Sequence, residues 1–140
     1  MILRRTCTTE ADLAMLAADF GARLMPGDVV ALAGPLGAGK TAFVRALVEA
    51  RLGGDPVSSP TFVFRHRYPG TPPIEHLDLY RIEDPRELPE LGLEEAFDGE
   101  AIVLVEWWRH APSLLPARRY EVEIDGAGAG PRTVAIREPA

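Results

Sequence analysis

Asparagine and glutamine are absent from this sequence of 140 residues, and lysine occurs once, at Lys40. The other 14 of the 15 basic residues are arginine. Such a preference for arginine, combined with avoidance of amide side chains, is typical of a genomic or thermophilic compositional bias. The bias accounts for the arginines, and it leaves the single lysine to be explained.

Cysteine is equally scarce, because Cys7 stands alone and so excludes a disulfide between two of these residues and a cysteine-cluster metal site. No apolar run approaches the roughly 18 residues that a membrane helix needs, and no signal-peptide segment follows the start. We therefore expect a cytoplasmic protein with no membrane association. The net charge of −6 argues against broad, non-specific binding to nucleic acid.

The length and composition are those of one globular domain spanning residues 1–140, with 46% hydrophobic and 26% charged residues. Apolar periodicity predicts a helix that begins after Thr9, a helix over 41–52 and short helical turns in 84–97. Strands are predicted at 2–6, 29–33, 62–68, 74–79, 101–105, 120–124 and 133–137. This order indicates an α/β fold, with a mixed sheet that has a parallel centre and antiparallel edge hairpins, flanked by helices.

A glycine-rich segment lies between the apolar run 29–33 and the helix over 41–52. It matches the phosphate-binding pattern G-x-x-x-x-G-K-[ST] at every position, in the strand-to-helix context that this pattern requires. Backbone N–H groups of such a loop converge on phosphate oxygens, and the helix N-terminus adds partial positive charge. The candidate nucleotide-binding residues are Gly34, Pro35, Leu36, Gly37, Ala38, Gly39, Lys40 and Thr41.

Two of these residues have side chains with a specific chemical task. Lys40 is expected to reach the β and γ phosphates as a compact cation, and the Thr41 hydroxyl is expected to ligate Mg²⁺. A chain that otherwise uses arginine keeps lysine where a planar guanidinium does not fit. The composition therefore supports the motif independently.

A nucleotide-bound metal also needs an acidic residue, which normally follows a buried strand next to the loop. Glu106 directly follows the apolar run 101–105, and Asp78 lies on the alternating strand 74–79. Both are candidates for metal binding and hydrolysis, and the pattern leaves open which is the main metal acid. Ser59-Pro60-Thr61 provides a loop hydroxyl that could sense the γ-phosphate, although such a sequence is more often a simple turn.

Other chemically suggestive residues have ordinary structural interpretations. Trp107 and Trp108 are expected to be one core and one surface residue if the strand continues through them. His66 and His76 have no partners at metal-ligand spacing, so core or surface positions are the default. The arginines of segment 65–81 could form a basic strip, but a solvated face is more common.

The missing residue types restrict the nucleotide. Ras-type proteins read guanine with Asn-Lys-x-Asp, which a chain with no asparagine and a single lysine cannot contain. ATP or ADP is therefore expected, with Mg²⁺. Nor can a glutamine position the attacking water, so intrinsic hydrolysis should be slow.

Four segments in this order and spacing resemble the TsaE (YjeE) family: the glycine-rich loop 34–41, Ser-Pro-Thr-Phe at 59–62, His-Leu-Asp-Leu-Tyr-Arg at 76–81, and Val-Glu-Trp at 105–107. The resemblance covers nearly the whole chain and implies a P-loop NTPase-like fold. It also implies a small ATPase of tRNA threonylcarbamoyladenosine synthesis that acts with TsaB and TsaD, with tRNA contacted only indirectly through that complex.

Matched by motif, the family assigns roles to several residues of this chain. Thr41 and Glu106 correspond to metal positions, Asp78 to an acid needed for hydrolysis, and Thr61 to a switch threonine. By weaker analogy, Glu10 and Arg132 approach the nucleotide. The resemblance thus implies catalytic roles for Lys40, Thr61, Asp78 and Glu106.

Two other functions remain open at this stage. A small-molecule kinase would use the same loop, but its lid usually carries arginines, whereas segment 84–97 is mostly acidic with only Arg86. A nucleotide-binding partner module without hydrolysis is the second alternative.

Overall fold

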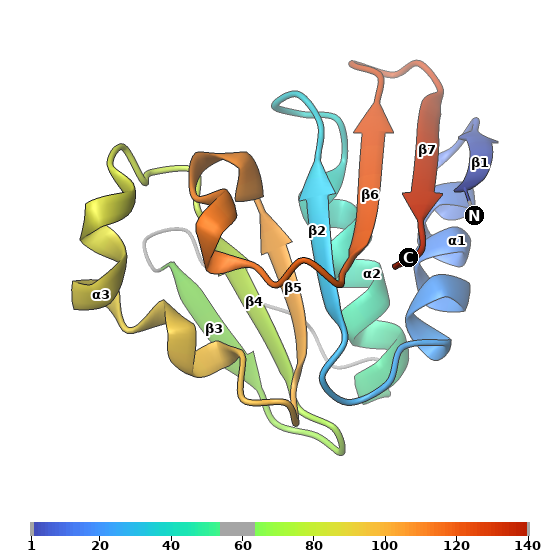
Figure 1. Cartoon of the computed structure of the whole chain (residues 1–140). Coiled ribbons are helices and arrows are strands. Elements are labelled where there is room, and N and C mark those ends of the chain that lie inside the picture. The colour runs from blue at the N-terminus through green and yellow to red at the C-terminus, as the bar shows by residue number, and fades with distance from the viewer. Residues whose placement is uncertain (1, 54–63, 140) are drawn as a thin grey trace.

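The computed structural model describes residues 2–53 and 64–139, in which a seven-stranded sheet has the order β1-β7-β6-β2-β5-β4-β3 (Figure 1). The strands are β1 Ile2–Cys7, β2 Val29–Ala33, β3 Arg65–Tyr68, β4 Ile74–Asp78, β5 Ile102–Glu106, β6 Tyr120–Asp125 and β7 Arg132–Arg137. Strands β6, β2, β5 and β4 are parallel to one another, whereas β1, β7 and β3 pair antiparallel to their neighbours. The predicted mixed sheet is confirmed.

Helices α1 (Glu10–Ala22) and α2 (Lys40–Leu52) cover one face of the sheet. Short helices cover part of the other face: η1 Pro85–Glu87, α3 Leu88–Leu91, η2 Leu93–Ala96, η3 Trp108–His110 and η4 Pro112–Leu114. No helix in the described ranges is long and apolar enough to cross a membrane. Two hydrophobic clusters fill the spaces on the two faces of the sheet.

Local sequence signals explain where the elements begin. The Thr9 hydroxyl accepts a hydrogen bond from the Asp12 backbone N–H at 3.1 Å, and the Asp12 carboxylate accepts one in return from the backbone N–H of Thr9. This capping box satisfies backbone donors that the first helical turn leaves unpaired. Strand β2 is apolar throughout and β5 is apolar up to its last residue, Glu106, and both strands are fully buried, as expected for strands covered on both faces.

Most predicted strands differ from the observed ones by one residue at an end, and three further differences lie near the glycine-rich loop or β3 and β5. Helix α2 begins at Lys40 rather than at residue 41. Strand β3 starts at Arg65, and residues 62 and 63 of the expected strand 62–68 lie outside the described residues. The chain also leaves the sheet at Trp107, which has a positive φ of 57°, so Trp108 opens helix η3 and is buried. The strand therefore does not continue through the tryptophan pair.

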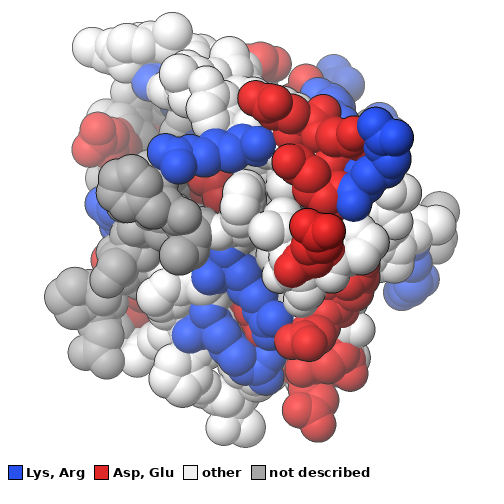
Figure 2. Space-filling view, turned by 90° about the vertical axis from the view of Figure 1, so that its left-hand side faces the viewer, with Lys and Arg blue, Asp and Glu red and all other residues white. Residues whose placement is uncertain are grey.

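Two of the three arginines that could form a basic strip, Arg65 and Arg67, pair with the same acidic residue. Arg65 donates to Glu75 from Nε at 2.9 Å and from Nη2 at 2.7 Å, and Arg67 donates from Nη1 at 2.6 Å. Glu75 is fully buried, so both guanidinium groups neutralise one desolvated carboxylate. On the side of the molecule that carries β3 and α3, basic and acidic side chains lie beside one another (Figure 2).

Replacing Glu75 by glutamine is expected to lower the free energy of unfolding by about 2 kcal/mol, because two arginines lose the carboxylate between them. The partial exposure of both arginines limits the loss. Urea unfolding provides the measurement. Glu95→Gln is the matched control, since the side chain of Glu95 also pairs with Arg65 but is 79% exposed. Equal stability of both variants would contradict the importance of the buried carboxylate.

Candidate nucleotide and metal site

The glycine-rich loop joins the end of β2 to the start of α2 at one edge of the sheet, with all its residues described. A Cβ atom at Gly34, where φ is +150°, would lie 2.2 Å from the carbonyl oxygen of Ile124. Gly39 precedes α2 with a φ of 113°, and no side chain caps the helix there. The first turn of α2 also carries no acidic residue. Its backbone N–H groups and partial positive charge are therefore available to an anion.

Lys40 lies under this loop rather than in solvent, with 4% of its surface exposed. Its Nζ donates to the carbonyl oxygens of Gly34 at 2.5 Å and Pro35 at 3.1 Å, and it lies 4.1 Å from the centre of the Trp107 ring. Burial lowers the pKa of Lys40, while Glu106 and Asp78 act in the opposite direction. The ammonium group thus occupies a narrow site shaped by carbonyls and an aromatic face.

The two acidic candidates lie at the carboxyl ends of adjacent parallel strands. Leu32, Glu106 and Asp78 occupy one row across β2, β5 and β4. Glu106 is buried, and its Oε1 accepts a hydrogen bond from the Thr41 hydroxyl at 3.0 Å. The other carboxylate oxygen, Oε2, lies 2.6 Å from Nε2 of His76. Thr41 and His76, which lie 65 and 30 positions before Glu106 in the sequence, are thereby connected through its carboxylate.

Asp78 has a different environment from Glu106. It is half-buried, and its Oδ1 accepts a hydrogen bond from the backbone N–H of Tyr80 at 3.0 Å. Burial raises the pKa of Asp78, and the Glu106 carboxylate adds to this effect. The Tyr80 N–H, His76 and Lys40 lower the pKa in opposition. Two carboxylates with different surroundings therefore lie in one row.

This environment predicts a pH-dependent contribution of Asp78 to stability. The folded state retains the proton of Asp78 at pH values where the unfolded chain has released it. The contribution of this carboxyl group to stability therefore falls as pH rises from the ordinary pKa of aspartate through the raised pKa. The stability of Asp78→Asn relative to the wild type should therefore rise with pH in urea unfolding.

Asp84→Asn provides a control of opposite sign for this titration. Side-chain and backbone hydrogen bonds from Arg86 lower the pKa of Asp84, so its contribution is lost as pH falls through that lowered pKa. This variant should lose stability relative to the wild type as pH rises. The same pH trend in both variants would contradict the assignment for Asp78.

The remaining predicted residues occupy different positions relative to the loop. Arg132 donates from Nε to the carbonyl oxygen of Ala38 at 2.8 Å, and its Nη2 lies 3.4 Å from the carbonyl oxygen of Gly37. It thus ties the start of β7 to the phosphate loop. Glu10 is exposed at the start of α1. Thr61 lies outside the described residues.

The sequence analysis did not place two residues at this site, His76 and Trp107. His76 is buried, which agrees with the expected core or surface position, but nothing in the sequence indicated its contact with Glu106. Trp107 faces Lys40, and its ring lies 4.9 Å from that of Tyr80 and 5.5 Å from that of His110. A pocket of about 270 Å³ is lined by Trp107, His110 and Lys40, together with Gly34 and Pro35 of the loop. The motifs placed His76 two residues from Asp78 and Trp107 directly after Glu106, which was the available signal.

Comparison with known protein families gives a match that includes the residues of this site. A family model described as "Threonylcarbamoyl adenosine biosynthesis protein TsaE" matches residues 7–134. The chain belongs to the TsaE family. The matched residues include the loop, both acidic residues and Arg132, although the match assigns no role to any of them.

Relatives from several bacteria have the same description, tRNA threonylcarbamoyladenosine biosynthesis protein TsaE. The Bacillus subtilis protein is 41% identical over 112 residues, covering 79% of this chain and 70% of the relative. The Rickettsia typhi protein is 37% identical and covers 95% and 93%. Among solved structures, Bacillus subtilis YdiB has a TM-score of 0.82 at 30% identity, covering all of this chain and 87% of YdiB. The P-loop fold is thereby confirmed.

Proposed function

We propose that this chain is a magnesium-dependent ATPase with a low intrinsic rate, required for threonylcarbamoyladenosine modification of tRNA and acting with TsaD and TsaB. The observation that carries the proposal is the convergence of Lys40, Thr41, Glu106 and Asp78 at one edge of the sheet. A cation, a hydroxyl and two carboxylates around a glycine-rich loop are the groups that phosphoryl transfer from a nucleotide needs.

Each residue has a proposed role in binding ATP or ADP. The backbone of residues 34–41 would hold the phosphates, and Lys40 would turn from its carbonyl partners toward the β and γ oxygens. Thr61 would act as a switch residue, and Glu10 and Arg132 would approach the nucleotide. The contact of Arg132 with Ala38 supports a role in fixing the loop rather than direct chemistry.

The donor set fits Mg²⁺, because the Thr41 hydroxyl and the carboxylates of Glu106 and Asp78 offer the oxygen ligands that this cation prefers. Among the described residues, no group of three or more His, Cys, Asp and Glu side chains is arranged to hold a metal by itself. A cation here would therefore share phosphate oxygens with the nucleotide. When bound, Mg²⁺ neutralises charge that develops on those oxygens.

Recognition of tRNA is assigned to the partner proteins. Arg65 and Arg67, which a basic strip would need, neutralise the buried Glu75 instead. Tight binding of tRNA to the isolated chain at physiological salt would contradict this assignment. A kinase lid is likewise poorly supported, because Arg86 pairs with Asp84 at 2.7 Å.

ATP turnover with and without TsaB and TsaD tests the proposal. We expect slow turnover by the isolated chain, stimulation by the partners, and loss of the stimulated rate in Lys40→Ala and Glu106→Ala. Phosphate transfer to a metabolite would instead support a kinase. Nucleotide binding without hydrolysis under either condition would support a binding module.

A further inference from the structure

His76 is a buried histidine that the proposed reaction does not use. It lies on β4 between Ile74 and Asp78, on the face covered by α2, and 2% of its surface is exposed. Nε2 is 2.6 Å from Glu106, whereas Nδ1 is buried and has no hydrogen-bond partner among the described residues. A buried imidazole with one strong polar contact requires an explanation.

The contact determines which nitrogen carries the proton. A carboxylate only accepts hydrogen bonds, so the 2.6 Å contact requires a proton on Nε2 of His76. In the neutral ring this leaves Nδ1 as an unprotonated acceptor. An unpaired acceptor is tolerated more readily in protein interiors than an unpaired N–H, which agrees with the environment of Nδ1.

Each carboxylate oxygen of Glu106 therefore has its own hydrogen-bond donor. Oε1 accepts from Thr41 at 3.0 Å and Oε2 accepts from His76, so the carboxylate cannot rotate without losing a hydrogen bond. Groups that hold a metal-ligating side chain in this way set its orientation and tune metal affinity. A buried carboxylate without the imidazole would retain one partner and would be free to turn.

We propose that His76 is a positioning residue that holds Glu106 with one oxygen directed at Thr41, preparing the carboxylate for a divalent cation. The proposal rests on the function proposed above, in which Glu106 and Thr41 take Mg²⁺. His76 touches neither the nucleotide nor the cation in this role. Its effect is therefore on metal-dependent binding and not on the nucleotide alone.

Two substitutions separate positioning from packing. His76→Gln places an amide N–H near the position of Nε2 and can still donate to Glu106. His76→Met has a similar length but no donor. We expect His76→Met to require about tenfold more Mg²⁺ for half-maximal enhancement of ADP affinity, as typical for loss of such a supporting group. His76→Gln should stay within about threefold of the wild type.

The measurement is calorimetric titration of the full chain with ADP, once in EDTA and once at graded Mg²⁺ concentrations. In EDTA, both variants should bind ADP like the wild type. His66→Met is the matched control, because His66 is the cross-strand neighbour of His76 on β3. The centre of its ring lies 4.3 Å from that of Tyr68 and not beside Glu106. This control should leave the Mg²⁺ requirement unchanged.

Equal Mg²⁺ requirements in His76→Met and His76→Gln would overturn the positioning role while leaving the proposed metal site intact. No Mg²⁺ enhancement in the wild type would instead overturn the metal site and the positioning role together. If His76→Met does not fold, His76→Asn replaces it, because its shorter amide cannot reach Glu106. The same tenfold difference from His76→Gln is then expected, and its absence would overturn the proposal.

Discussion

Lys40→Arg is expected to weaken ADP and ATP binding by about 100-fold or more, although the positive charge is kept. The Nζ atom fits between two carbonyl oxygens and the face of Trp107, and the side chain is almost fully buried. A guanidinium is planar, larger and has five donors in a fixed arrangement. Loss of one charge-assisted interaction of about 3 kcal/mol corresponds to this change in affinity. Calorimetric titration provides the measurement.

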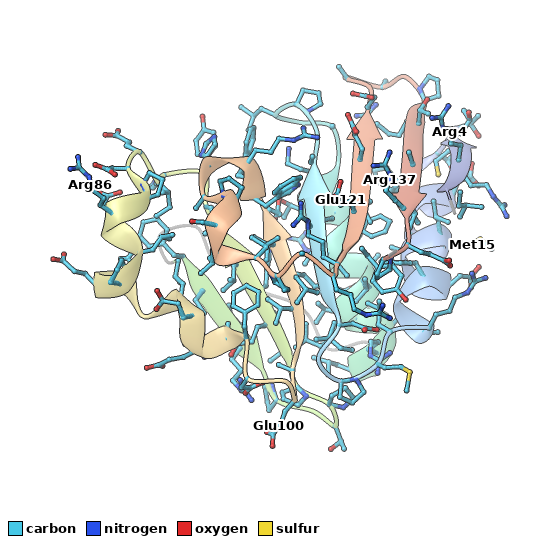
Figure 3. The ribbon with its side chains drawn as sticks, viewed as in Figure 1. Arg4, Met15, Arg86, Glu100, Glu121 and Arg137 are labelled. Atoms are coloured by element: carbon cyan, nitrogen blue, oxygen red, sulfur yellow. The ribbon has the colours of Figure 1, made fainter. Side chains whose placement is uncertain are left out.

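Arg137→Lys is the control for exchanging the two basic residue types. Arg137 is exposed on β7 opposite Glu121 of β6, and both side chains are labelled in Figure 3. The control should bind nucleotide like the wild type. Normal affinity and turnover of Lys40→Arg would show that charge alone suffices, and the argument from the single lysine would fail.

Glu106→Gln is expected to reduce Mg²⁺-dependent ATP turnover by about 100-fold, while ADP binding in EDTA is unchanged or tighter. Glutamine keeps the length of the side chain but removes the charge that a divalent cation needs, at a cost of about 3 kcal/mol. Without metal, the carboxylate repels the phosphates, so its removal does not weaken binding. Turnover assays and calorimetry with and without Mg²⁺ provide the two measurements.

The control for this charge removal is Glu95→Gln, because the side chain of Glu95 is 79% exposed on η2. It should leave both properties unchanged. Equal weakening of ADP binding by Glu106→Gln with and without Mg²⁺ would indicate a general effect on the loop and would contradict a metal role.

The predictable parts of the structure depend on contacts between residues close in sequence. Thr9 and Asp12 are one helical turn apart, and the helix start predicted after Thr9 depends on this local contact. The continuous apolar residues of β2 and β5 predicted buried strands because both faces needed cover. The glycine spacing of residues 34–39 predicted a loop that lets the backbone approach an anion.

The turn after β5 was less predictable than the strand itself. A continuous apolar run does not show in which direction the chain leaves the sheet, and the positive φ of Trp107 has no glycine to signal it. The turn directs Trp108 into the hydrophobic cluster beneath the short helices, and it directs Trp107 toward Lys40. Packing on both sides of the chain therefore decided the roles of two adjacent, chemically identical residues.

The sequence by itself determined the α/β order, the phosphate-binding pattern and the exclusion of a guanine motif, since these depend on residue type and short spacing. The tertiary structure decided which buried polar groups meet. His76 contacts Glu106, and Arg132 contacts Ala38 across 94 residues. The physical reason is that a desolvated charge must find a partner, and the order of strands in the sheet decides which partner lies within reach.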